Sequence, residues 1–498
     1  MSVAIVGGGP AGLLSALLLA RDGREVVVLD QDDLTPAADP ETAAEEAYRP
    51  GAPQAVQPHI VMPRCRLVLA ERLPDVLADL IDAGAVEATL ADRRPPTLAS
   101  LPVRPGDERL TTVMTRRSTF DWVLRRAAAR QSGVEIRAER VTGLVARPGP
   151  VPHVCGVRTA QGPISADAVV DASGRRSPID KWLEELDARP AENQSAECGV
   201  TYYGRHYRLR TQAALPGLAN TRIVVPFDEF TAVLFCSDSG AVQTAVAPLT
   251  ADRRYRQLAH EDVYDAVLRA LPTHAPWMPC MDPISPVRQM VAPRNTLRRL
   301  VVDATPRATG LLPVGDAVST TNPTFGRGLS LAAWGAADVA DVLAEHSGEP
   351  VAQVLALDAR IAHHVVPYYE EQARTDLARL AALRHVVLGT PLVVQGRGAQ
   401  PIGFAHLRAA AAVEATAFRA LWELMGMLRS PKEIYSDPDV LAAISKTAPD
   451  LPSPSPDMAM LQAALCRRSA TRSASGSRIG TAAQTGRAGA PVPHRTAT

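Results

Sequence analysis

Residues 3–30, VAIVGGGPAGLLSALLLARDGREVVVLD, constrain the fold of this chain more than any other stretch. A short apolar run at 3–6 leads into a glycine turn at 7–12. A helix-forming segment, a turn at Asp22-Gly23 and a second β-branched run follow, and that run ends in Asp30. Strand, turn, helix and strand in this order predict the opening of a βαβ unit.

The glycines of this turn have the spacing of a dinucleotide-binding site. Gly7 allows a tight exit from the strand, Gly9 lets the backbone approach a pyrophosphate, and Gly12 lets the helix pack close to the sheet. The phosphates then lie on unpaired N–H groups at the helix start. Asp30 lies 18 residues after Gly12 (30 − 12), near the spacing expected for an acid that binds a ribose hydroxyl. The turn predicts a dinucleotide, NAD or FAD, bound by Gly7, Gly9, Pro10, Ala11, Gly12 and Asp30.

Composition excludes several classes of protein. Lys+Arg and Asp+Glu balance at 53 each, which gives no electrostatic case for nucleic acid or an anionic membrane. The 6 cysteines are scattered without a C-x-x-C pair, so we expect neither a disulfide framework nor a metal site. We expect no signal peptide, because the first strand starts at residue 3, and no membrane span, because the most apolar N-terminal stretch, residues 13–20, is too short. We therefore expect a soluble, cytoplasmic protein. We also expect two or more lobes, because a chain of 498 residues is longer than a single hydrophobic core usually organises.

Two later segments repeat the pattern of a buried strand that ends in an acidic glycine turn. Residues 166–174 end in Asp171-Ala172-Ser173-Gly174, and residues 311–317 end in Gly315-Asp316. The second is followed by a loop at 319–328 that contains Pro323, Gly326 and Gly328, and then by an apolar helix at 329–346. Between them, residues 198–248 consist of alternating and β-branched runs, which predict an antiparallel sheet in a second lobe.

These three ordered motifs resemble those of the FAD-dependent monooxygenases of the aromatic-hydroxylase superfamily. The resemblance implies FAD as the cofactor. It implies that Asp316 accepts a hydrogen bond from a ribityl hydroxyl, and that N–H groups around Gly328 and Leu329 face the flavin pyrimidine. Pro323 would line the face where oxygen reacts. The implied cofactor residues of these motifs and their surroundings are Arg117, Val141, Asp171, Gly174, Gly315, Asp316, Gly326, Gly328 and Leu329, and the flavin-face loop holds Asn322, Pro323 and Phe325.

The resemblance also implies an α/β fold class and a domain organisation. A glutathione-reductase-type, Rossmann-like FAD-binding domain would take residues 1–190 and 285–348. An antiparallel β substrate domain would take 191–284, and a helical C-terminal region 349–450. Residues 451–498 are rich in Pro, Ser, Ala, Gly and Arg, and we expect a disordered tail there.

A narrower resemblance links residues 51–61, 171–186 and 315–333 to the soluble bacterial flavin epoxidases of polyether assembly, which are distant relatives of squalene epoxidase. Gln54 and His59 match the pattern of those epoxidases, whereas Val56 and Gln57 replace an arginine and a histidine. This departure means that the epoxidase substrate is not carried over to this chain.

The implied reaction is the insertion of one oxygen atom from O2 into a small substrate through a flavin C4a-hydroperoxide, by epoxidation or hydroxylation. A role in secondary metabolism, such as antibiotic biosynthesis, would follow. Because only 4% of the residues are aromatic, we expect an apolar, largely aliphatic substrate site. Its candidate wall residues are Tyr202, Tyr203, Phe227, Phe230 and Phe235. No second G-x-G-x-x-G follows a strand, so electrons would come from NAD(P)H directly or from a separate flavin reductase.

Three alternatives stay open. A flavin halogenase would need a lysine in its substrate tunnel, and the only lysine before Lys432 is Lys181. An O2-independent FAD reductase of isoprenoid-like double bonds would share the fold. A flavoprotein without enzymatic activity would share the cofactor motifs.

Overall fold

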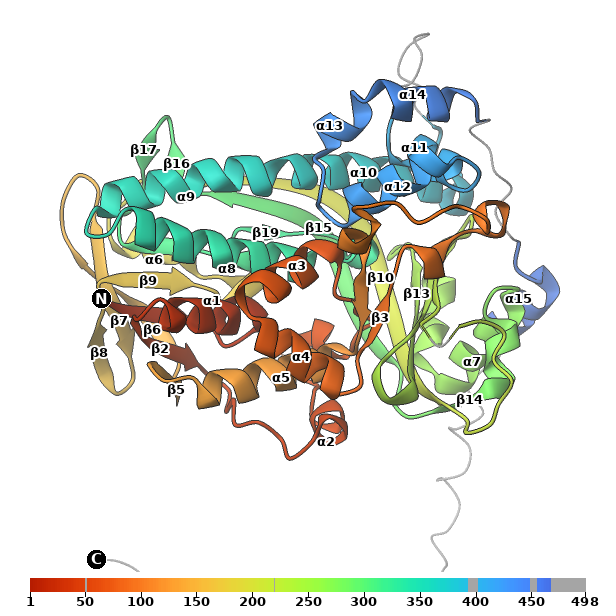
Figure 1. Cartoon of the computed structure of the whole chain (residues 1–498), viewed down its shortest axis with the longest axis horizontal. Helices are drawn as coiled ribbons and strands as arrows, with labels where there is room; N and C mark the ends of the chain where they lie inside the picture. Colours follow the sequence, from red (N-terminus) through yellow and green to blue (C-terminus); the bar gives the residue numbers. More distant parts are fainter. Residues whose placement is uncertain (50–51, 219, 393–401, 448–454, 467–498) are drawn as a thin grey trace, which may run out of the picture.

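A five-stranded parallel sheet forms the centre of the first lobe (Figure 1). The structure, a computed structural model, describes residues 1–49, 52–218, 220–392, 402–447 and 455–466. The strands lie in the order β18-β9-β1-β2-β5. Their bounds are Leu311–Pro313, Ala168–Asp171, Ser2–Val6, Glu25–Asp30 and Val134–Ala138.

Alternate residues of these strands enter two different cores, as expected for a sheet covered on both faces. Ile5 and Val170 belong to the core formed with the helices α1, α5 and α8. Ala4 and Val169 belong to a second core on the opposite face. The bounds of these three helices are Pro10–Arg21, Arg117–Arg130 and Gly328–Glu345.

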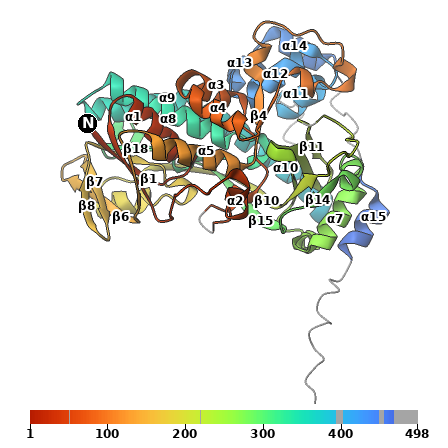
Figure 2. The same ribbon diagram turned by 60° about the horizontal axis from the view of Figure 1, so that its bottom comes forward.

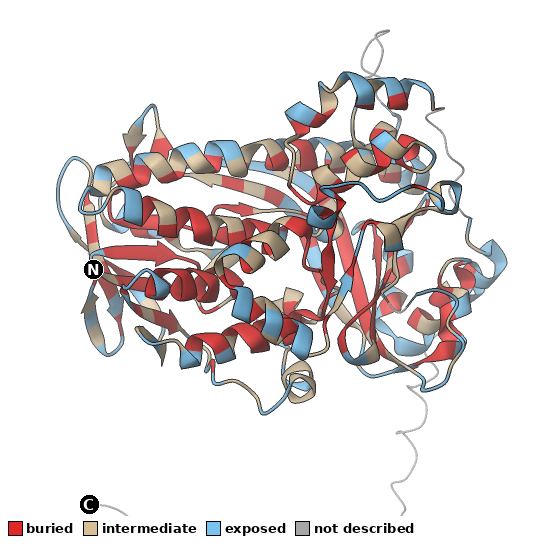
Figure 3. Cartoon of the chain, in the orientation of Figure 1, coloured by how far each residue is buried: buried red, intermediate tan, exposed pale blue. Residues whose placement is uncertain are grey.

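The helix α1 is buried along almost its whole length, from Pro10 to Ala20 (Figure 3). It packs against α8 and α5, and α3 and α4 extend this helical layer. The helices α3 and α4 cover Pro63–Arg72 and Pro74–Asp82. A helix that is apolar all round fits only such an interior position.

The opposite face of the parallel sheet is covered by the three-stranded antiparallel sheet β6-β7-β8 and by α6. Figure 2 shows β6, β7 and β8 gathered at one end of the molecule. These elements span Val141–Arg147, His153–Thr159, Gly162–Ser165 and Ile179–Glu185.

The second lobe is built on a seven-stranded sheet in the order β11-β12-β13-β10-β15-β19, with β14 paired to β10. The strand β15 lies beyond the boundary expected at 285, yet it pairs with β10 in this sheet. The helix α7 (Glu261–Ala270) packs on the sheet. The strands span Arg222–Pro226, Phe230–Cys236, Ala241–Pro248, Glu192–Leu209, Arg288–Arg299, Ser319–Thr320 and Met281–Pro283.

The C-terminal region is helical, and its helix α10 (Val366–Leu388) lies against β10 and β15. The helix α15 (Met458–Leu465) lies inside the segment expected to be a disordered tail, and buries Leu461 and Ala464 beside α7. The rest of that expectation, residues 451–454 and 467–498, lies outside the described residues. The other C-terminal helices are Pro350–His364 (α9), Phe404–Ala411 (α11), Ala415–Met425 (α12), Pro431–Tyr435 (α13) and Pro438–Ser445 (α14).

Besides short 3-10 helices, the described chain has two small hairpins and one further short α-helix. The short helix α2 (Pro40–Glu45) interrupts the long polar segment after Asp30. The hairpin strands are Val86–Ala88 (β3) with Thr112–Met114 (β4), and Val301–Val302 (β16) with Thr305–Pro306 (β17). Within the described ranges, no helix is both long and apolar enough to cross a membrane.

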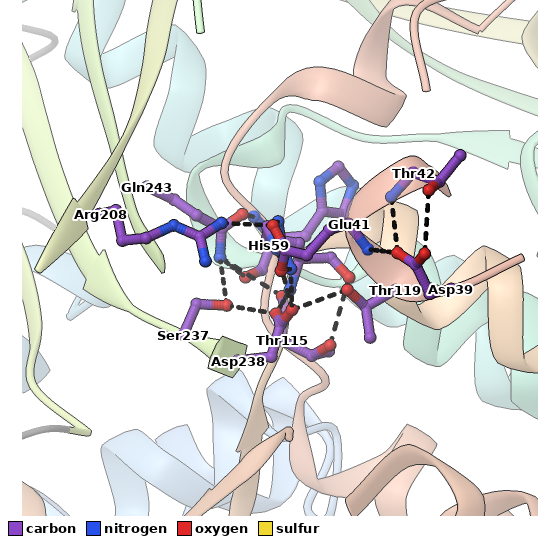
Figure 4. A network of polar contacts seen from close by, with 11 residues as sticks. Asp39, Glu41, Thr42, His59, Thr115, Thr119, Arg208, Ser237, Asp238 and Gln243 are labelled. Atoms are coloured by element: carbon purple, nitrogen blue, oxygen red, sulfur yellow. Dashed lines mark hydrogen bonds and ion pairs between the residues drawn. The ribbon is translucent and has the colours of Figure 1, made fainter. Parts of the chain in front are cut away.

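A buried ion-pair network joins the two lobes (Figure 4). Asp238 and Arg116 are almost completely buried and meet at 2.7 Å. Thr119 donates a further hydrogen bond of 2.7 Å to Asp238. Arg116 also pairs with Glu41 of α2, to which Arg208 of β10 donates as well. The network therefore ties α2 and the start of α5 to the antiparallel sheet.

We expect Asp238→Ala to destabilise the protein by about 3–5 kcal/mol, because Arg116 would remain buried without its main partner. Burial alone would raise the pKa of Asp238, but the Arg116 charge outweighs it and the pKa is lowered. This contribution is therefore full at neutral pH and is lost as the pH falls through the native-state pKa. Urea unfolding at several pH values measures both effects.

The control is Asp282→Ala, since Asp282 forms an exposed pair with Arg210. Solvent screens an exposed pair, so we expect the loss of stability to be much smaller than in Asp238→Ala. Equal losses in the two variants would contradict the assignment of the Asp238 pair as the link between the lobes.

Candidate functional site

A cavity of about 560 Å³ lies at the edge of the parallel sheet, between the two lobes. All three glycine motifs contribute to its wall, although they lie far apart in the sequence. They meet because the carboxyl ends of β1, β9 and β18 share one sheet edge. The predicted cofactor residues that line the cavity are Gly7, Gly9, Pro10, Ala11, Asp30, Arg117, Val141, Gly174, Asp316, Gly326, Gly328 and Leu329.

In the first glycine turn, Gly7 and Gly12 lie close to neighbouring backbone, whereas Gly9 borders open space. Gly7 has φ +105°, and a Cβ there would lie 2.5 Å from the Ala172 carbonyl oxygen. A Cβ at Gly12 would lie 1.9 Å from the Gly7 carbonyl oxygen. A Cβ at Gly9 meets no atom within 4 Å and would project into free space. Gly7 and Gly12 thus allow the backbone segments to pack closely, while the space beside Gly9 is free for a ligand.

Two helix starts that face the cavity lack side-chain caps. Neither the α1 N-cap, Gly9, nor the α8 N-cap, Arg327, provides a side-chain hydrogen bond. The first N–H groups of a helix have no intrahelical partner, here no N-cap side chain accepts from them, and each helix dipole places positive charge there. Gly328, like Gly9, leaves open space where a Cβ would be. The two helix starts fit the two anionic parts of FAD, its pyrophosphate and its reduced flavin ring.

Two of the predicted acids hold backbone turns. Asp30 accepts hydrogen bonds from the backbone N–H groups of Gly8 (2.6 Å) and Asp32 (3.0 Å), and it also lines the cavity. Asp171 is fully buried and accepts hydrogen bonds from Ser173 and Ser177. It does not line the cavity, and its carboxylate holds the turn whose Ser173 and Gly174 do.

Asp316 places a carboxylate at the cavity wall, close to the second helix start. Burial raises the pKa of Asp316, and the charges of Arg117 and Arg175 offset part of that rise. Arg117 is itself buried and donates to Asp121 at 2.6 Å. Gly315 has φ +62°, and a Cβ there would lie 2.8 Å from the Cβ of Ala11. Gly315 therefore packs against α1 and does not line the cavity. Asp316 is thus placed to accept a hydrogen bond from a hydroxyl-bearing ligand.

The predicted flavin-face loop divides its side chains between the cavity and the interior. Pro323 lines the cavity. Asn322 is buried behind it and donates to Asp376 of α10 at 2.9 Å. Phe325 packs on Phe404, with ring centroids 4.3 Å apart. Within this loop the side chains of Asn322 and Phe325 therefore support the loop, and they do not line the cavity.

Only one of the five candidate substrate aromatics, Phe235, lines the cavity. Tyr203, Phe227 and Phe230 lie in the core of the second lobe. Tyr202 donates a hydrogen bond of 2.5 Å to the Asn322 side chain and so braces the loop. Alternation along a strand tells which face of the sheet a residue occupies, but it does not tell core from cavity.

Several cavity residues were not singled out as site residues in the sequence. His59 is the clearest case, because it was noted only as part of the epoxidase-like pattern. Its Nδ1 lies 2.9 Å from the Gln57 carbonyl oxygen, and its backbone exchanges two hydrogen bonds of 3.0 Å with the Gln243 side chain (Figure 4). Burial, with the charge of Arg117, lowers the pKa of His59 to about 4. His59 is therefore a neutral imidazole held rigidly at the wall.

Comparisons with known proteins agree with this geometry. Residues 1–38 match the profile of the FAD binding domain family. Protein Rv3254 of Mycobacterium tuberculosis (strain ATCC 25618 / H37Rv) is 28% identical over 359 residues, which cover 66% of this chain and 69% of that protein.

Two solved structures share the fold. The flavin-dependent brominase Bmp2 has a TM-score of 0.56 at 17% identity, covering 90% of this chain and 99% of Bmp2. A variant of 2-methyl-3-hydroxypyridine-5-carboxylic acid oxygenase has a TM-score of 0.53 at 17% identity, covering 79% of this chain and 95% of the oxygenase. The α/β fold class expected from the sequence is confirmed, and the match of residues 1–38 supports FAD as the cofactor.

We expect Gly9→Ala to weaken FAD binding by about tenfold or more without destabilising the apoprotein. Gly9 has φ −78°, which alanine adopts readily, and the added methyl group would occupy only ligand space. Gly12→Ala is the contrasting variant, since its methyl group would collide with the backbone and lower the melting temperature. Titration with FAD and thermal unfolding of the apoproteins measure the two effects. Unchanged FAD affinity in Gly9→Ala would contradict the assignment.

We expect Asp316→Ala to weaken FAD binding by about tenfold, the usual contribution of a hydrogen bond to a charged group. The apoprotein should not lose stability. Burial raises the pKa of Asp316, so its ionised form costs free energy above that pKa and the alanine variant removes the cost. Flavin content after gel filtration and thermal unfolding measure both. Asp262→Ala on the exposed surface of α7 is the control, and full flavin retention in Asp316→Ala would refute its role.

Proposed function

We propose that this chain is an FAD-dependent monooxygenase that inserts one oxygen atom from O2 into a small organic substrate. The observation that carries the proposal is the convergence of three distant glycine motifs on one cavity between the lobes. The match of residues 1–38 to the FAD binding domain supports the cofactor, and the name of the oxygenase with the same fold supports the reaction class.

The residues of the first lobe would hold the cofactor in a defined orientation. The start of α1 would bind the pyrophosphate, Asp30 a ribose hydroxyl, and the backbone near Val141 the adenine. Asp316 would accept a hydrogen bond from the ribityl chain. FAD, when bound, supplies the redox chemistry with O2. The start of α8 at Gly328 would stabilise the negative charge of the reduced ring, because its N–H groups and dipole favour an anion.

The residues of the second lobe would place the substrate against that ring. Phe235, Met290 and Ala292 of the antiparallel sheet line the cavity, and Pro323 lines it from the first lobe. These apolar side chains would exclude water from the reacting atoms, which protects reactive oxygen chemistry. Electrons would come from NAD(P)H or a separate flavin reductase. This arrangement is compatible with epoxidation and with hydroxylation. It is also compatible with a role in secondary metabolism.

A halogenase is disfavoured by a specific observation. Lys181 is exposed and lies 3.6 Å from Glu185 on the surface of α6. Among the described residues, none of those that line the cavity is a lysine. An O2-independent reductase would use the same cofactor residues and is separated from a monooxygenase by the fate of oxygen.

We expect product formed under 18O-labelled O2 to carry one labelled oxygen atom, with the second atom released as water. The FAD-loaded protein is supplied with NAD(P)H, with and without a flavin reductase, and with a substrate panel. Mass spectrometry of the products measures the label. Saturated product formed without O2 would instead establish the reductase, and labelled product from Gly9→Ala protein without FAD would contradict the role of the cofactor.

A further inference from the structure

The guanidinium of Arg222 lies at the second-lobe end of the cavity, and none of the described residues forms an ion pair with it. Arg222 lies on β11 and lines the cavity. Its Cζ lies 5.4 Å from the Phe235 ring centroid and 5.2 Å from the Trp422 ring. Its Nε is buried and has no hydrogen-bond partner among the described residues. Two aromatic rings therefore flank the group, and neither neutralises its charge.

The other arginines of the cavity wall are either paired or exposed. Arg49 lies 3.4 Å from Asp32, and Arg117 lies 2.6 Å from Asp121. Four more are exposed to solvent, and these are Arg140, Arg175, Arg176 and Arg294. Within the part of the chain that the structure describes, Arg222 thus combines partial burial with the absence of an ion pair.

Sheet register directs Arg222 to the same side as two other cavity elements. Arg222 is paired across strands with Phe235, and Phe235 with Gln243. Directly opposed residues of an antiparallel sheet project from one face. Gln243 on that face holds His59, and both His59 and Phe235 line the cavity. The imidazole of His59, the ring of Phe235 and the guanidinium of Arg222 therefore lie along one wall of the cavity.

A partly buried cation without a counter-ion costs free energy unless a ligand neutralises it. Burial lowers the pKa of Arg222 to about 10, so the group stays charged at neutral pH. A guanidinium presents parallel N–H groups that match the two oxygens of a carboxylate. The motif residues that fit FAD belong to the first lobe, so the ligand at Arg222 is a molecule other than the cofactor.

We propose that Arg222 binds the carboxylate of an organic acid substrate, whose apolar body lies along Phe235 and Met290 toward Pro323. The proposal rests on the proposed function, because it assigns the second-lobe end of the cavity to the substrate. It changes the expectation of a wholly apolar substrate into that of an amphipathic one with a single anionic end.

The test compares carboxylates with their neutral amides on the FAD-loaded protein. The probes are benzoate with benzamide and octanoate with octanamide, and binding is followed by flavin difference spectra and calorimetry. We expect at least one carboxylate to bind about tenfold tighter than its amide, a difference that Arg222→Met abolishes and Arg222→Lys partly retains. Arg126→Met is the matched control, since Arg126 stacks on Trp122 at 4.5 Å outside the cavity.

Three outcomes would overturn the proposal. These are equal or undetectable binding of carboxylates and amides by the unchanged protein, an unchanged preference in Arg222→Met, and loss of bound FAD in Arg222→Met, which would assign Arg222 to the cofactor. The readout is binding and needs no turnover. A carboxylate preference without 18O incorporation would therefore refute the monooxygenase reaction and leave the acid-binding site in place.

Discussion

The cavity depends on backbone segments that approach one another too closely for any side chain. A Cβ at Gly7 would collide with Ala172, and a Cβ at Gly12 would collide with Gly7 itself. A Cβ at Gly315 would meet Ala11. These approaches bring the ends of β1, β9 and β18 together with the starts of α1 and α8. The contacts of Gly7 and Gly12 are with main-chain atoms and that of Gly315 is with the Ala11 methyl group, so the cavity edge is built from closely packed backbone.

The parts of the site that sequence could predict are those fixed by local geometry. The turn at Gly7, Gly9 and Gly12 needs only its own spacing, and Asp30 follows at the end of the next strand. Short apolar runs also predicted the buried strands of the α/β fold, which the structure has. Asp316 lies at the cavity for the same reason, since it belongs to the turn that follows β18.

The parts that sequence could not predict depend on contacts between distant segments. The Asn322 side chain is turned inward by Asp376, 54 residues further along the chain. Glu371 of α10 lies 2.9 Å from the fully buried Arg327, which directly precedes α8. The C-terminal helix α10 thus supports the loop that would face the flavin, although nothing near position 322 indicates such a partner. Likewise, alternation could not separate Phe235 at the cavity from Phe227 in the core.

Whether a buried arginine has a carboxylate partner separates structural residues from ligand-binding residues in this chain. Arg116 and Arg327 are deeply buried, and each has a carboxylate beside it, Asp238 and Glu371 respectively. Both ion pairs lie within the protein and join elements to one another. Arg222 has no such partner among the residues that the structure describes, and it lines the cavity between the lobes. The chain as a whole balances its charges, so this local imbalance is not a consequence of a basic composition. A site that leaves one cation uncompensated beside apolar walls selects a ligand that brings the missing negative charge.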